Sequence, residues 1–113
     1  MNYSYEEIGA VCATFRCQDD IQPGQTCQIC ENDTVALADD TCPFDGVVVS
    51  RRGDCAAVMV RGFVTVPFGG DTPYVGSNYL QADGCGCVCG AQDGRLCLIT
   101  HVDTVNNTVT FLL

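Results

Sequence analysis

The feature that most constrains the fold is a long apolar run at residues 55–67, Cys-Ala-Ala-Val-Met-Val-Arg-Gly-Phe-Val-Thr-Val-Pro. Side chains alternate between the two faces of a β-strand, and every even position of this run except Gly62 is aliphatic. The run therefore predicts one continuous apolar face that packs in a core, whereas the odd positions mix apolar side chains with Arg61 and Thr65. Because Gly62 has no side chain to pack, we expect a bulge or a sharp bend there. Pro67 ends the run, since it cannot donate a ladder hydrogen bond.

The rest of the chain is typical of short strands separated by turns. No window predicts an amphipathic helix longer than two turns, and many short strands indicate an all-β barrel or sandwich with little helix. We expect a single β domain over residues 11–113, preceded by an N-terminal arm or short helix over residues 1–10. The other expected strands occupy residues 9–17, 26–29, 34–38, 46–50, 79–82, 95–102 and 108–113.

Length and charge limit the function classes. A chain of 113 residues fits one small domain. It contains no lysine, and five arginines against fourteen acidic residues give a net charge of −9. Such a charge repels phosphates and anionic membrane surfaces, so we expect no nucleic-acid partner and no membrane partner. The first eight residues lack a positive end followed by an apolar stretch, so we also expect no export signal and synthesis in the cytoplasm.

Ten cysteines allow three interpretations. Their density is typical of extracellular disulfide frameworks, but the expected absence of an export signal argues against that compartment. Cys27 and Cys30 have the spacing of a zinc knuckle, and Cys85, Cys87 and Cys89 could supply further thiolates to a zinc, iron–sulfur or redox module. The spacing of Cys85, Cys87 and Cys89 differs from that of the second knuckle that usually completes a zinc site. Free, mostly buried thiols acting as small hydrophobic residues are therefore the preferred interpretation, with no metal and no cofactor.

Catalytic chemistry has little support. His101 is the single histidine, and strand alternation predicts that it shares a face with Arg95, Cys97 and Ile99, which makes a Cys–His pair formally available. A lone histidine near a strand end is more often a packed or surface residue. The acidic residues are spread through expected turns, and no two have a spacing that requires general acid and base roles. We predict that the protein is not an enzyme and has no small-molecule substrate.

Five segments carry a resemblance to a known family. They are Asp33-Thr-Val-Ala-Leu-Ala38, Phe44-Asp-Gly-Val-Val-Val-Ser50, Ala57-Val-Met-Val-Arg-Gly-Phe-Val-Thr-Val-Pro67, Gly76-Ser-Asn-Tyr-Leu-Gln-Ala-Asp-Gly84 and Val102-Asp-Thr-Val-Asn-Asn-Thr-Val-Thr-Phe-Leu112. Together they resemble the small head decoration, or head-fibre-like, proteins of tailed bacteriophages and prophages. The resemblance covers the chain from about residue 26 to its end.

The resemblance implies a β-tulip-like decoration-protein fold, often trimeric. It implies a structural virion protein that is made in the bacterial host, binds the outside of the major capsid protein shell and reinforces it without enzymatic activity. It also implies small or polar residues where this chain has Cys85, Cys87 and Cys89, so cysteine richness is where the sequence departs from the family.

Contacts with other protomers or with the capsid are expected at three places. The first is the mixed face of the 55–67 run, the second is the loop after Pro67 with an aromatic residue at each end, and the third is the N-terminal arm. The expected contact residues are Tyr3, Tyr5, Ile8, Met59, Arg61, Phe63, Phe68 and Tyr74.

Overall fold

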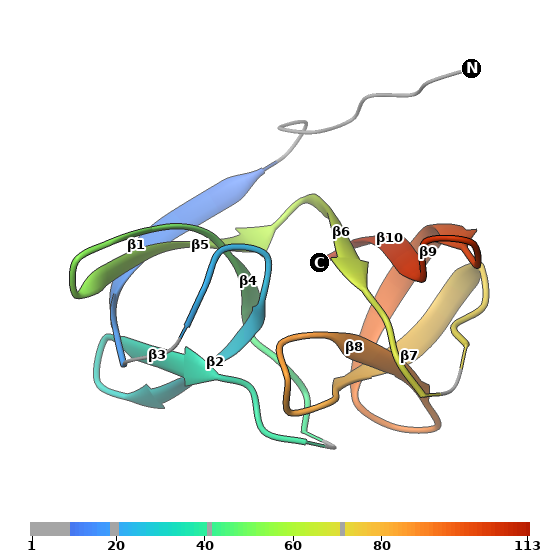
Figure 1. Cartoon of the computed structure of the whole chain (residues 1–113), viewed down its shortest axis with the longest axis horizontal. Coiled ribbons are helices and arrows are strands. Elements are labelled where there is room, and N and C mark those ends of the chain that lie inside the picture. Colours follow the sequence, from blue (N-terminus) through green and yellow to red (C-terminus); the bar gives the residue numbers. More distant parts are fainter. Residues whose placement is uncertain (1–9, 19–20, 41, 71) are drawn as a thin grey trace.

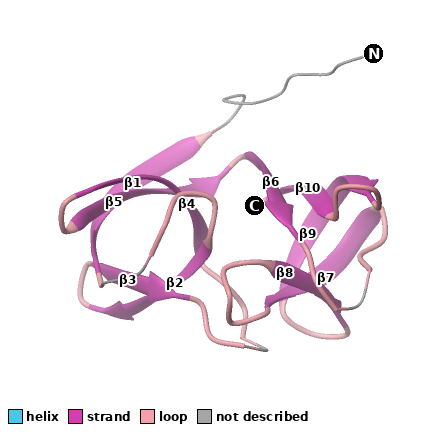
Figure 2. Ribbon diagram, in the orientation of Figure 1, coloured by secondary structure: helices cyan, strands magenta, loops and turns pink. Residues whose placement is uncertain are grey.

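The computed structural model describes residues 10–18, 21–40, 42–70 and 72–113. This part of the chain forms ten β-strands and no helix (Figure 2), which confirms the expected all-β fold. It accordingly includes no helix that could cross a bilayer. The strands are β1 (Val11–Cys17), β2 (Thr26–Glu31), β3 (Thr34–Leu37), β4 (Gly46–Arg52), β5 (Cys55–Arg61), β6 (Phe63–Pro67), β7 (Gly76–Ala82), β8 (Val88–Ala91), β9 (Arg95–Asp103) and β10 (Thr108–Leu112).

The ten strands form two sheets that lie side by side (Figure 1). The first five strands close into a barrel in the order β1-β3-β2-β4-β5, and the last five form a sheet in the order β6-β10-β9-β7-β8. The barrel closes through β1, which pairs antiparallel with β5 and parallel with β3. Closure removes the exposed edges that an open sheet of five strands would have.

The apolar run that dominates the sequence divides at Gly62 into two strands, β5 in the barrel and β6 in the second sheet. Gly62 has a φ of 126°, a conformation that other residues rarely adopt, which confirms the expected bend. The prediction of one continuous apolar wall is wrong, because the chain changes sheet at this bend. Ala56 and Val58 lie in the barrel core, whereas Val66 lies in the core of the second sheet.

Two apolar cores stabilise the fold, and each fully buried aliphatic or aromatic side chain contributes roughly 1.5–3 kcal/mol. The smaller core fills the barrel with Ile21, Cys27, Val35, Val48, Ala56 and Val58. The larger core lies under the second sheet and contains Ala38, Phe44, Val47, Val66, Leu80, Ala82, Val88, Cys97, Ile99, Val109, Phe111 and Leu113. Because the first three of these come from the barrel half of the chain, the two sheets share the larger core.

Backbone hydrogen bonds also join the two sheets. The Thr26 amide donates to the carbonyl of Gly86 at 2.9 Å, and the Ala82 amide donates to the carbonyl of Cys42 at 2.9 Å. Gly86 allows the first of these contacts, since a Cβ at this position would lie 2.6 Å from Cγ of Gln25. The loop before β8 therefore docks directly on the barrel.

One strand was not expected from the sequence. β8 lies in a segment rich in glycine and cysteine, which has low intrinsic strand propensity and predicts a loop. It forms because its four residues pair with β7, from Ala82 opposite Val88 to Tyr79 opposite Ala91. Tertiary pairing therefore overrides local preference at this position.

Candidate functional site

The Cys27–Cys30 pair does not form a zinc knuckle. Both residues lie on the extended strand β2, where three residues span roughly 10 Å. Cys27 is buried in the barrel and Cys30 is exposed. A zinc ion holds its sulfur ligands at about 2.3 Å, so these two thiols cannot reach one ion without unfolding the strand. Burial, with a further contribution from the charge of Asp45, raises the pKa of Cys27 to about 12, which disfavours the thiolate that a metal would need.

Two of the later cysteines, Cys85 and Cys87, belong to a loop closed by Asp83. Its Oδ1 atom accepts hydrogen bonds from the amides of Cys85 at 2.8 Å and Cys87 at 3.0 Å. Burial and the neighbouring carboxylate of Asp83 raise the pKa of the Cys87 thiol. Cys89 lies on β8, and its thiol donates to the carbonyl of Gln81 at 3.8 Å. The described residues contain no cluster of three or more side chains that could hold a metal ion.

All ten cysteines are free in the structure, but most are not buried. Only Cys27 and Cys97 are buried, whereas Cys12, Cys30 and Cys85 are exposed and the other five are half-buried. The expectation of mostly buried thiols is therefore wrong. Burial depends on the face of each strand that meets a core, and cysteine spacing alone does not determine that face.

A bulge in β9 separates His101 from the cysteine expected to share its face. Ile99 lies opposite Phe111 and His101 lies opposite Thr110, so one additional residue, Thr100, interrupts the alternation of faces. Cys97 and Ile99 are buried, whereas His101 is exposed. The expectation that His101 shares a face with Cys97 and Ile99 is therefore wrong, and no Cys–His pair forms between Cys97 and His101.

The expected contact residues are spread over the described structure. Met59 and Phe68 are half-buried and pack on the larger core. Arg61 is exposed at the end of β5, and Phe63 begins β6 after the bend. Tyr74, which is 75% exposed, lies in the loop before β7. Their contact roles stay predictions, and Tyr3, Tyr5 and Ile8 lie outside the described residues.

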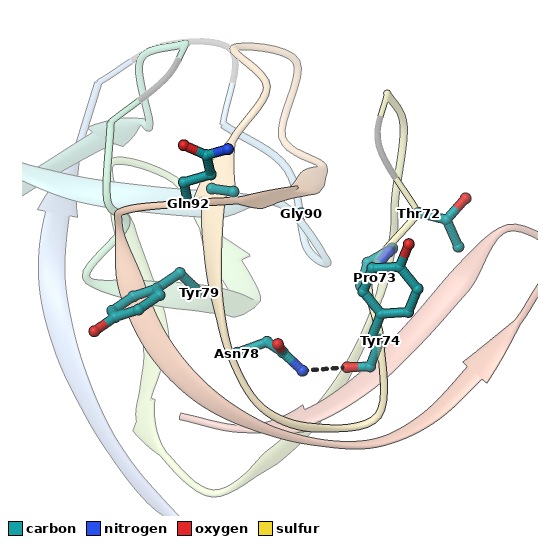
Figure 3. Close-up of a pocket in the computed structure, with 8 residues that line it drawn as sticks. Thr72, Pro73, Tyr74, Asn78, Tyr79, Gly90 and Gln92 are labelled. Atoms are coloured by element: carbon teal, nitrogen blue, oxygen red, sulfur yellow. Dashed lines mark hydrogen bonds between the residues drawn. The ribbon is translucent and has the colours of Figure 1, made fainter.

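Tyr74 also borders a hollow of about 370 Å³ between its loop and the end of β8 (Figure 3). The Asn78 side chain crosses the floor of this hollow and donates to the carbonyl of Tyr74 at 2.8 Å. The described residues that line it carry no charge at neutral pH. The hollow therefore offers shape and hydrogen-bonding groups, and its described lining includes no carboxyl, imidazole or thiol group.

A surface that the sequence analysis missed lies on the second sheet. Tyr79, Leu96 and Leu98 are exposed by 42%, 58% and 44%, on the side of the sheet away from the larger core. The sequence contains a signal for this surface, because residues 96–99 read Leu-Cys-Leu-Ile and are apolar at both odd and even positions. A strand that is apolar on both faces indicates a second buried face.

Comparison with known proteins identifies the fold. No family model matches the chain, and no curated protein sequence matches it. The structure is similar to the crystal structure of the N base of head fiber gp8.5 in bacteriophage phi29, with a TM-score of 0.65 and 18% sequence identity. The match covers 92% of this chain and 93% of the phage chain. The head-fibre-like fold expected from the strand segments is therefore confirmed, and this chain has the fold of a phage head fiber base.

Proposed function

We propose that this protein is a non-enzymatic structural component of a phage or prophage virion. In this proposal it is made in the cytoplasm of the bacterial host, forms a homotrimer and binds the outside of the major capsid protein shell, where it decorates and stabilises the head. The observation that carries the proposal is the fold shared with the phage head fiber base over 92% of this chain.

The site chemistry supports the same proposal. Among the cysteines that could have formed a metal or redox module, Cys27 is buried and Cys30 exposed on β2, whereas the later three are divided between the loop closed by Asp83 and strand β8. His101 has no cysteine partner on its face of β9. A structural role requires neither a metal ion nor a catalytic pair, and it requires surfaces that bind other proteins. Arg61, Phe63 and Tyr74 remain proposed contact residues for the shell or for neighbouring protomers.

The test uses heads of the phage whose genome encodes this chain, prepared from a strain in which its gene is deleted. Purified protein is mixed with these heads, and the bound fraction is measured by co-sedimentation over a range of protein concentrations. We expect saturable binding with a fixed ratio of protein to major capsid protein, and bound heads should resist heating better than bare heads. Heads of an unrelated phage are the control. Protein that stays in the supernatant with its own heads at every concentration would refute the proposal.

A further inference from the structure

The outer face of the second sheet carries a contiguous apolar patch. We define this patch as Phe63, Tyr79, Leu96, Leu98 and Leu112, which lie on four neighbouring strands. Leu112 lies directly opposite Phe63 on one side and Leu98 on the other. Leu96 lies directly opposite Tyr79. Directly opposed residues have Cβ atoms about 4.5–5.5 Å apart, so these side chains form one surface across the sheet.

The same face is almost free of charge, although the chain carries −9. Among the outward-facing strand positions of the described sheet, Asp103 alone is charged at neutral pH when histidine is counted as neutral. Asp103 lies at the hairpin end of β9, where its Oδ1 accepts hydrogen bonds from the amides of Val105 and Asn106. Hydrogen bonds from Asn106 and Val105 hold the pKa of Asp103 below its ordinary value. The patch itself contains no ionised side chain.

Two threonine hydroxyl groups beside the patch are hydrogen-bonded to each other. The hydroxyl groups of Thr65 and Thr110 lie opposite each other on β6 and β10 and are 2.8 Å apart, at hydrogen-bonding distance. A buried hydroxyl is costly when it loses its partners, and this pair retains a partner when water is excluded. This threonine pair beside Leu112 can therefore be covered with little penalty.

We propose that this apolar patch lies at the threefold axis of the homotrimer and packs against the same patch of two other copies. The proposal rests on the proposed function, which includes the trimer. A residue beside a threefold axis meets two copies of itself, so any charge there would face two like charges. Like charges oppose the self-association of an acidic chain, and a surface that its acids avoid keeps this repulsion low. Burial of exposed leucine and tyrosine side chains supplies the driving force.

The experiment is a comparison of two charge insertions at positions of similar exposure. Leu98→Glu places an acid in the patch, and Val49→Glu places one on barrel strand β4, where Val49 is 47% exposed against 44% for Leu98. Leu96→Glu, at 58% exposure, repeats the patch insertion at a more accessible position. Sedimentation velocity over a range of concentrations gives the mass of each species, and circular dichroism during thermal unfolding shows whether each variant is folded.

We expect the native chain and Val49→Glu to sediment as trimers. Leu98→Glu and Leu96→Glu should sediment as folded monomers at the same concentration, with the association constant lowered on the order of 100-fold or more. If the native chain is a trimer that binds heads and both patch variants remain trimers, the patch is not the interface and the proposed function stands. If the native chain is a monomer that fails to bind heads, both proposals fail.

Discussion

The ring of Phe44 packs edge-on against the ring of Phe111, with centroids 5.9 Å apart and an interplanar angle of 65°. Phe44 precedes barrel strand β4, and Phe111 lies on β10 of the second sheet. The guanidinium of Arg95 lies 5.8 Å from the Phe44 ring centroid, and its Nη1 donates to the Phe44 carbonyl at 3.4 Å. A single aromatic residue from the barrel half thus helps to complete the core of the other half.

Replacement of Phe44 should destabilise both halves together. Phe44 is 1% exposed, and truncation of a buried phenylalanine to alanine costs about 3–5 kcal/mol, because apolar burial is lost and a cavity remains. Phe44→Ala should therefore lower the free energy of unfolding by that amount in a denaturant titration. Val105→Ala, at a residue 87% exposed, is the control and should change it by less than about 0.5 kcal/mol. A loss below about 1 kcal/mol for Phe44→Ala would contradict the shared core.

Gly62→Ala should be costly for two separable reasons. Its φ of 126° is unfavourable for other residues, and a Cβ would lie 3.0 Å from the Ala10 Cα and 3.1 Å from the Met59 sulfur. We expect a loss of about 2–4 kcal/mol in the free energy of unfolding, from backbone strain and crowding together. Gly76→Ala is the matched control, because Gly76 also has a positive φ, 103°, but nothing lies within 4 Å of the position that its Cβ would take. Equal losses for the two variants would show that packing around Gly62 has no role.

Cysteine reactivity should follow burial in the native protein. Iodoacetamide should modify the exposed thiols of Cys12, Cys30 and Cys85 first, and it should leave the buried thiols of Cys27 and Cys97 unmodified. Peptide mass spectrometry after timed quenching measures the modified fraction at each position. The control is the same reaction in denaturant, where all ten thiols should react. Modification of Cys27 as fast as Cys30 would contradict the closed barrel core.

Stability should fall at alkaline pH because burial raises the thiol pKa of Cys27 to about 12 and that of Cys97 to about 11, from an ordinary 9.0. Above pH 9 the unfolded chain loses these protons while the folded chain keeps them, so each thiol lowers stability by about 1.4 kcal/mol per pH unit. This loss begins near pH 9 and ends as each folded pKa is reached. Denaturant titrations at pH 8 and pH 10 measure the slope.

Removal of one buried thiol tests the cause of that slope. Cys97→Val keeps an apolar side chain of similar size in the larger core and removes its titrating group. The difference in stability between pH 8 and pH 10 should therefore shrink for this variant by about 1.4 kcal/mol. An unchanged difference would assign the alkaline loss to other groups.

Local sequence signals predicted most strands but not all of their partners. Turn residues and alternation placed the strands around Val35, Val47 and Val109 correctly, because turn chemistry and face periodicity act over a few residues. They failed at β8, where pairing with β7 makes a strand from glycine and cysteine. They also failed at His101, because a bulge changes the face of every later residue in the strand.

The sequence by itself determined the all-β class and the bend at Gly62. These properties follow from residue types over short distances. Tertiary structure alone decided that the 55–67 run divides between two sheets, that Cys27 and Cys30 diverge, and that Leu96, Leu98 and Tyr79 form one exposed surface. Pairing between strands distant in the sequence sets these outcomes, because the face that each side chain takes depends on the register its strand adopts.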